Sequence, residues 1–331
     1  MAVVEKTIIA AGGGDYTTAQ SWEDAADGEA TDVWHGVITG SVGDCTFSAW
    51  SATVDADNRP TLRGASGSTH NGVVGAGATI GTIAATAVGF YLHVYDLNVL
   101  SLFIRETDNM TFERNIFKHT AATNQALLRA QKSSSGSDTM IGMLFQNNLF
   151  VCDVATRGIY LLASVSGTAT ATLTISILNN TMVGDASLAE GLYASATESS
   201  GGTTVINVTA KNNIFLDAAT ADMQEVKAGT GAAAINWTSS NNLTSDATAD
   251  DFGGTGHHIN QTLADVISAS TYIPVIGGNA HNGGAATGLL VDLAGNTRPI
   301  QTTIDIGAFE EQTAAVFWPP YYYRQLQSVQ T

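Results

Sequence analysis

The feature that most constrains the fold of this chain is a repeat of about thirty residues that is marked by asparagine. In each repeat a run of alternating apolar residues leads to asparagine and a second apolar run, as in residues 144–150 (LFQNNLF) and 208–215 (VTAKNNIF). The last asparagine of the motif recurs at spacings of 33, 32, 33 and 29 residues, at Asn115, Asn148, Asn180, Asn213 and Asn242. Period-two alternation within such a repeat predicts a β-solenoid with one repeat per turn.

Other repeat architectures fit this sequence less well. Tetratricopeptide and ankyrin repeats need two amphipathic helices per unit, which a segment such as residues 168–175 (TATATLTI) cannot form. Propeller blades need about 40 to 45 residues each. The chain also has no proline between Pro60 and Pro274, as expected where every backbone N–H is needed for a strand ladder. We therefore expect an all-β solenoid.

The asparagines are expected to form a structural ladder. Neighbouring coils of a solenoid lie about 4.8 Å apart, so residues one period apart lie above one another. Stacked asparagines can pair their amides at a corner and can adopt the left-handed backbone of a tight turn. We expect the apolar residue after each asparagine to face a shared interior, and these residues are Ile116, Leu149, Ile214 and Leu243.

An acidic residue follows four of the asparagines at a nearly constant distance, at Asp153, Asp185, Asp217 and Asp246. Clustered carboxylates are typical calcium ligands. Calcium-binding solenoids, however, carry nine-residue repeats dense in glycine and aspartate, and this chain has none. We interpret these acids as turn caps that face water, and we predict no metal and no cofactor.

Charge and cysteine content restrict the partners and the compartment. Thirteen basic residues against thirty acidic ones give a net charge of −17, which repels nucleic acid and anionic membrane surfaces. No apolar run reaches the length of a membrane span, and the N-terminus does not resemble a signal peptide. Cys45 and Cys152 are interpreted as small buried hydrophobes, which favours assembly in a reducing cytoplasm.

The motifs resemble those of right-handed parallel β-helix proteins of the pectate-lyase-like superfamily. Residues 292–299 (DLAGNTRP) and 305–310 (DIGAFE) are similar to the ending of many such chains, and residues 15–25 (DYTTAQSWEDA) to the opening of bacterial and phage members. The resemblance implies a right-handed parallel β-helix. We expect a helix capped by Ser21 to plug the first coil with Trp22. The expected organisation is an N-terminal cap and first strands over 1–62, a β-helix over 63–312 and a C-terminal arm over 313–331.

The best-known activity that the resemblance implies is polysaccharide cleavage, which needs carboxylates contributed by neighbouring coils. Asp250, Asp251, His257 and His258 superficially match a hydrolase pattern, but they lie within one glycine-rich loop rather than one period apart. Asp108 and Glu113, which flank Met110, are a further candidate carboxylate pair across a strand. The sequence therefore predicts no catalytic residue, although a lyase or glycoside hydrolase remains the alternative.

The C-terminal arm differs in composition from the rest of the chain. Aromatic residues and two prolines are concentrated in one short stretch, Phe317, Trp318, Pro319, Pro320, Tyr321, Tyr322, Tyr323 and Arg324. Interface cores concentrate aromatic residues and arginine, and prolines reduce the entropy lost on docking. We predict that the arm binds another subunit or a partner protein. Packing over the last coil is the alternative.

Together these features favour a non-enzymatic structural protein of a bacteriophage virion. We expect an oligomeric capsid decoration or cement protein, assembled in the host cytoplasm and attached to other virion proteins through its arm. The alternative is a phage tail or tailspike β-helix that binds or depolymerises host surface polysaccharide. A secreted bacterial adhesin is disfavoured by the lack of a signal peptide. The phage setting rests on the resemblance and on no single residue.

Overall fold

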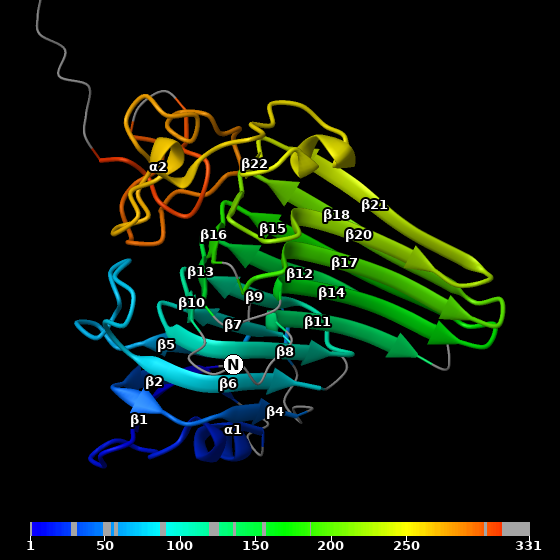
Figure 1. Ribbon diagram of the computed structural model, residues 1–331. Helices are drawn as coiled ribbons and strands as arrows, with labels where there is room; N and C mark the ends of the chain where they lie inside the picture. The colour runs from blue at the N-terminus through cyan, green and yellow to red at the C-terminus, as the bar shows by residue number, and fades with distance from the viewer. Residues whose placement is uncertain are drawn as a thin grey trace, which may run out of the picture.

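The computed structural model describes residues 2–27, 32–48, 54–55, 59–86, 91–118, 126–134, 137–153, 157–185, 187–300 and 303–312. Over these ranges the chain forms a right-handed parallel β-helix of about seven turns, which confirms the expected fold class (Figure 1). All strand pairs within its two sheets are parallel, as a solenoid requires. Among the described helices, none has the length and apolar character needed to cross a membrane.

One face of the β-helix is a nine-stranded sheet. In pairing order its strands are β1 (Ala2–Ile9), β2 (Asp32–Thr39), β5 (Thr61–Gly64), β7 (Leu92–Tyr95), β9 (Met110–Glu113), β12 (Asp138–Gln146), β15 (Thr170–Leu178), β18 (Thr203–Lys211) and β21 (Ala232–Ser240). Burial alternates strictly along β15 and β18, so each strand contributes one residue in two to the interior.

The second sheet bends around the other two faces. Short strands follow the asparagine corner, namely β10 (Ile116–Lys118), β13 (Leu149–Cys152), β16 (Thr181–Gly184), β19 (Ile214–Leu216) and β22 (Leu243–Thr244). Longer strands form the third face, namely β11 (Ala126–Ser134), β14 (Arg157–Ser166), β17 (Glu190–Ser199) and β20 (Ala221–Ala228). β8 (Asn98–Arg105) joins the two faces, because its first part pairs with β10 and its later part with β11. β6 (Thr79–Ala85) lies next to β8 and pairs also with β3 (Ser41–Val42) and β4 (Cys45–Phe47).

The interior is filled by columns of stacked apolar side chains. The rings of Phe117 and Phe150 are stacked with centroids 4.6 Å apart, and those of Phe112 and Phe145 are stacked at 5.3 Å. The second residue after Asn115, Asn148 and Asn213 therefore points inward, as Phe117, Phe150 and Phe215. Met182 takes the same place after Asn180.

The prediction that the first of these apolar residues faces the interior was wrong. Because side chains alternate along a strand, Ile116, Leu149, Ile214 and Leu243 point out of the coil. They are nonetheless buried, because they belong to two separate clusters formed with C-terminal residues. Leu293 and Phe309 cover Ile116 and Leu149, and Ile306 covers Ile214.

A short helix closes the N-terminal end of the coil, as the sequence predicts. Helix α1 (Ala19–Asp27) buries Trp22 completely, in edge-to-face contact with Phe47 at 6.2 Å. A Cβ on Gly36 would lie 2.9 Å from the Trp22 ring, so only glycine leaves room for this plug. The predicted cap was wrong, because Ser21 lies within the helix. Its N–H donates to Thr18 Oγ1 at 3.0 Å, which makes Thr18 the capping residue.

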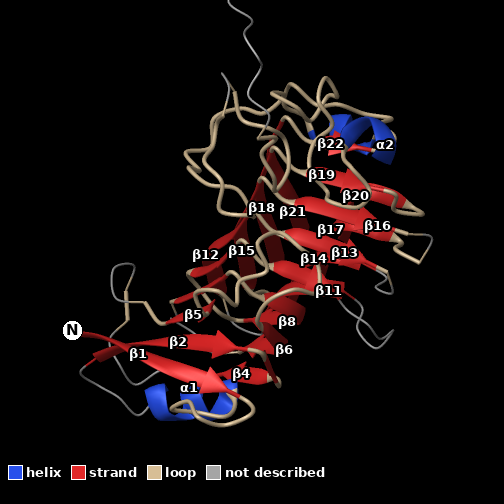
Figure 2. Ribbon diagram, turned by 90° about the vertical axis from the view of Figure 1, so that its left-hand side faces the viewer, coloured by secondary structure: helices blue, strands red, loops and turns tan. Residues whose placement is uncertain are grey.

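The C-terminal region forms a lobe beside the upper coils. It begins with η1 (Thr248–Phe252) and α2 (Leu263–Val266) and continues as residues 280–300 and 303–310, here called the strap. The strap is orange to red in Figure 1, and Figure 2 shows this region as loops beside the stacked strands. It descends along the asparagine corner against the coil order, with contacts from Asn241 to Gly283, Asn212 to Ala285, Asn179 to Thr287 and Asn147 to Val291.

Candidate functional site

The five predicted ladder asparagines lie on successive coils and bond to one another. The backbone N–H and Nδ2 of Asn148 both donate to Asn180 Oδ1 at 3.0 Å. Nδ2 of Asn148 also donates to Phe112 O at 2.9 Å, so the amide satisfies backbone and side chain together. The same pattern links Asn115 to Asn148, Asn180 to Asn213 and Asn213 to Asn242. The ladder is fully hydrogen-bonded, and its role is architectural.

The ladder ends on a histidine from the loop that superficially matched a hydrolase. Asn242 N–H donates to His257 Nδ1 at 3.1 Å, and His257 Nε2 is 2.9 Å from Gly253 O. The imidazole thus takes the place of the next asparagine. Asp250 and Asp251 are exposed in η1, so the loop does not form a catalytic cluster with them. In the ranges that the structure describes, no three His, Cys, Asp or Glu residues are placed to hold a metal.

A second column of asparagines, missed by sequence reasoning, runs beside the ladder. The first asparagine of each NN pair takes the left-handed backbone, with φ of 53° at Asn147 and Asn179 and 54° at Asn212. The side chains of this outward column hold the strap. Asn212 Nδ2 donates to Ala285 O at 2.7 Å, and its Oδ1 accepts the Ala285 N–H at 2.9 Å. The sequence contained a signal for this column, because two adjacent asparagines on one strand end point to different sides and therefore have different roles.

The DxxGxxR and DIGAFE motifs form a buried polar cluster, here called the clasp and made of Asp292, Arg298, Asp305 and Glu310. The Arg298 side chain is 0% exposed and pairs with Glu310 at 3.1 Å. Its other nitrogens donate to Asn147 Oδ1 and to two strap carbonyls, each at 2.7 Å. Burial lowers the pKa of Arg298 and raises that of Glu310, so desolvation outweighs their attraction. The two motifs therefore hold the strap in its folded conformation.

The recurring acids after the asparagines cap turns or pair with lysine. Asp185 accepts the Ser187 N–H at 2.8 Å, and its bonds to the hydroxyl and N–H of Ser187 lower its pKa. Asp246 accepts the Thr248 N–H at 2.9 Å. Asp153 pairs with Lys118 at 3.1 Å. Asp185 and Asp246 thus cap local turns as predicted, whereas the Lys118 pair of Asp153 and the bond from the Asp222 N–H to Asp246 reach other coils.

A charged cluster on the outer face of the nine-stranded sheet contains Glu113 but not its predicted partner Asp108. Glu113 is paired with Arg114 and with His93, whose Nε2 lies 3.4 Å away. Although burial opposes ionisation, His93 and Arg114 lower the pKa of Glu113. Asp108 accepts the Ile141 N–H at 2.8 Å instead. The predicted carboxylate pair does not form, and Glu113 is held as an ion-pair partner.

The outer face of β11, β14 and β17 carries a column of arginine and tyrosine. Tyr160 and Tyr193 are register partners with ring centroids 5.4 Å apart. The Arg157 guanidinium lies 4.1 Å from the Tyr193 centroid and 4.8 Å from that of Tyr160. The Arg129 guanidinium lies 5.3 Å from the centroid of the Tyr160 ring. Arg157 also pairs with its register partner Glu190 at 3.1 Å, so the column presents two cations stacked on aromatic rings together with one carboxylate.

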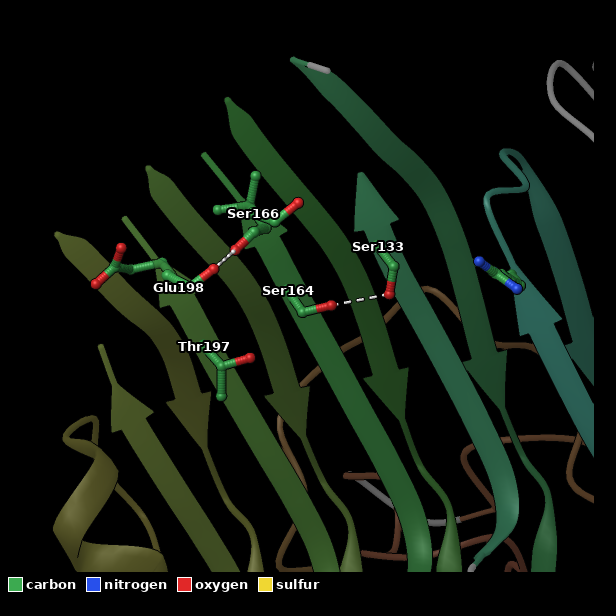
Figure 3. Close-up of a pocket in the computed structure, with 8 residues that line it drawn as sticks. Ser133, Ser164, Ser166, Thr197 and Glu198 are labelled. Carbon is green, nitrogen blue, oxygen red and sulfur yellow. Dashed lines mark hydrogen bonds between the residues drawn. The ribbon is translucent and has the colours of Figure 1, made fainter. Parts of the chain in front are cut away.

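Beside this column lies a shallow hollow of about 580 Å³ lined mainly by hydroxyl groups (Figure 3). Ser133 and Ser164 are register partners whose Oγ atoms are 2.8 Å apart, and Thr197 follows on the next coil. Arg105, Ser166 and Ser199 complete the polar rim. Glu198 accepts backbone N–H groups of two glycine turns, including that of Gly201 at 3.2 Å. The bond between the Ser133 and Ser164 hydroxyls and the engagement of the Glu198 carboxylate by glycine N–H groups favour binding over catalysis.

No protein-family model matches the chain, and no curated protein matches its sequence. The predicted partner-binding residues of the arm, from Phe317 to Arg324, lie outside the described ranges.

Proposed function

We propose that the chain is a non-enzymatic structural protein of a bacteriophage virion and serves as a capsid decoration or cement protein. A structural role is supported most directly by the histidine and carboxylate side chains that could take part in catalysis, because they are engaged in contacts that stabilise the fold. His257 ends the asparagine ladder, and the carboxylates of the clasp hold the strap. The phage setting is inferred from the resemblance of residues 15–25, 292–299 and 305–310 to β-helix proteins of phage and bacteria.

Rigidity supports the same proposal. Every coil in the ladder region is bonded to the next by backbone pairs and by asparagine amides, and the strap ties four coils together from outside. Such a β-helix resists deformation, because each coil is bonded to its neighbours, and this property suits a protein that reinforces an assembly. Attachment is assigned to residues 313–331 because of their aromatic and proline content.

Removal of residues 315–331 tests this assignment. We expect a chain with the circular dichroism and unfolding midpoint of the full protein that no longer copurifies with density-banded phage particles. Replacement of Phe317 and Trp318 by serine should have the same effect. Replacement of Gln325 and Gln327 by serine, in the same arm, is the matched control and should leave incorporation intact. Normal incorporation of the truncated chain would refute the arm as the anchor.

The arginine–tyrosine column favours a second candidate, binding of an acidic surface glycan. Sugar rings stack on aromatic faces, and guanidinium groups pair with carboxylates. We expect Arg157→Ala or Tyr193→Ala to weaken binding of an oligogalacturonate about tenfold in calorimetric titration. Thr172→Ala, on the opposite sheet, should leave binding unchanged. Release of reducing sugar would show cleavage rather than binding, and no binding of acidic or neutral oligosaccharides would exclude this candidate.

A further inference from the structure

A nearly inaccessible lysine lies near the end of β11. The side chain of Lys132 is 1% exposed and contacts the carboxylates of Glu106 and Asp138. Lys132 takes an interior position of β11, since burial alternates through Leu128, Ala130 and Lys132. Its register partner on the next coil is Ala163, whose small side chain leaves room for the lysine stem. An amine is thus held away from water between two acids.

Both carboxylates are oriented towards this amine by backbone groups. Glu106 Oε1 accepts the Ser133 N–H at 2.6 Å, which leaves Oε2 to contact Lys132. Asp138 Oδ1 accepts the Thr139 N–H at 2.7 Å, which leaves Oδ2 to contact Lys132. Glu106 also has φ of 58°, in a region that residues other than glycine seldom occupy. The fold accepts this backbone conformation where it presents the glutamate to the lysine.

We propose that Lys132 and Asp138 condense to form an intramolecular isopeptide bond, with Glu106 relaying the proton. In the neutral form of the pair, the lone pair of Lys132 Nζ attacks Asp138 Cγ, and the bond from Cγ to the carboxyl hydroxyl breaks. Glu106 takes a proton from the nitrogen and delivers it to the leaving hydroxyl. The products are a side-chain amide and one water molecule, so the step needs no oxidant and no cofactor.

The fixed geometry makes this condensation favourable. Groups held in reacting positions behave as if present at about 10⁵–10⁸ M, which opposes the large excess of water. Asp138 is 45% exposed, so the released water has a path to solvent, whereas the amine has none. Although burial disfavours its charged form, bonds to Asp138 and Glu106 raise the pKa of Lys132. The neutral pair is therefore the minor species, and the bond forms slowly after folding.

The mass of the denatured protein tests the proposal directly. We expect the folded protein to lose the mass of one water molecule over time, and a protease digest to give a branched peptide joined at Lys132 and Asp138. Lys132→Arg, which keeps the charge but cannot condense, should retain the full mass. Glu106→Gln, which keeps an acceptor for the Ser133 N–H, should slow the loss about 100-fold or more.

Lys227→Arg is the matched control. Lys227 belongs to the same register column and pairs with Glu225 at 2.7 Å, but it is 43% exposed. This variant should lose water as the original chain does. A full mass after long incubation of the folded original chain at neutral and mildly acidic pH would overturn the proposal. A water loss that persists in Lys132→Arg would also overturn it, and hydroxylamine cleavage would then locate a succinimide. The outcome is independent of any virion role.

Discussion

The asparagine ladder and the strap clasp lie on the same corner of the β-helix but stabilise it in different ways. The ladder repeats one uncharged bond on every coil, with Asn180 donating to Asn213 as Asn148 donates to Asn180. The clasp occurs once and buries charge, with Arg298 against Glu310. The ladder needs only the next coil. The clasp needs the strap to return across the corner to Asn147.

This difference shows how each device should fail. An uncharged ladder loses one rung at a time, because each amide bonds mainly to its neighbours. A buried charged cluster is strongly destabilised when one partner is removed, because the remaining charge is buried without a counter-charge. The following predictions are arranged to separate these two behaviours, beginning with the largest expected effect.

Arg298→Met should have the largest effect. It leaves the buried Glu310 carboxylate without its guanidinium, and we expect a loss of about 3–5 kcal/mol in the free energy of unfolding. Chemical denaturation followed by circular dichroism measures this loss. The double variant Arg298→Met with Glu310→Met should recover part of the loss, because no unpaired charge remains in that pair. A double variant less stable than the single one would contradict this account of the clasp.

Asn180→Ala should remove about 2–4 kcal/mol, because Asn148 loses its acceptor and the Phe145 carbonyl loses its donor. Asn179→Gly is the matched variant on the outward column. Glycine keeps the left-handed backbone, so the losses are the contact with Thr287 and two longer bonds, to Asp305 O and from Asn212 Nδ2. We expect about 1 kcal/mol from the same denaturation experiment. Equal losses in the two variants would mean that the ladder holds no advantage over the strap contacts.

Titration separates the uncharged ladder from buried acids outside it, because the ladder amides do not ionise whereas Asp222, near the start of β20, does. Asp222 is fully buried, and burial raises its pKa to about 6. The folded state therefore binds a proton more tightly than the unfolded chain, whose aspartates titrate near pH about 3.9. Stability should rise by up to about 3 kcal/mol as pH falls from about 7 to about 4. Asp222→Asn should remove this component, and an identical pH profile in both proteins would contradict the assignment.

His257→Ala should have the smallest effect. It removes the acceptor of the Asn242 N–H at the end of the ladder, where solvent can replace part of the bond. We expect a loss of about 1 kcal/mol, with faster amide exchange at Asn242 than at Asn180. Unchanged exchange at Asn242 would show that the imidazole does not close the ladder.

The spacing of the asparagines together with the period-two alternation between them was enough to predict the fold, because helical repeats of similar period lack that alternation. It did not decide which apolar residue after the corner faces inward. Ile116 and Phe117 are both apolar because both sides of β10 are covered, one by the interior and one by the strap. A strand that is buried on both faces shows no alternation of apolar and polar residues, so the sequence does not show which face points inward.

Only part of the candidate site could be predicted from the sequence. The clasp motif was identified by resemblance, but its role depends on Arg298 reaching Asn147, a contact across 151 residues that has no local pattern. The arginine–tyrosine column was accessible in principle. Arg129, Tyr160 and Tyr193 follow the repeat period and lie in register. It was missed because the repeat was applied to asparagine and acids rather than to every residue type.

The strap also limits how such a molecule can change length in evolution. Over the last three asparagine pairs it advances two residues per coil, from Gly283 at Asn241 to Ala285 at Asn212 and Thr287 at Asn179. A duplicated coil would therefore require a matching dipeptide insertion far downstream in the gene. Duplication of a repeat alone would leave the strap residues opposite the wrong asparagines of the corner. The strap therefore restricts changes in the number of coils.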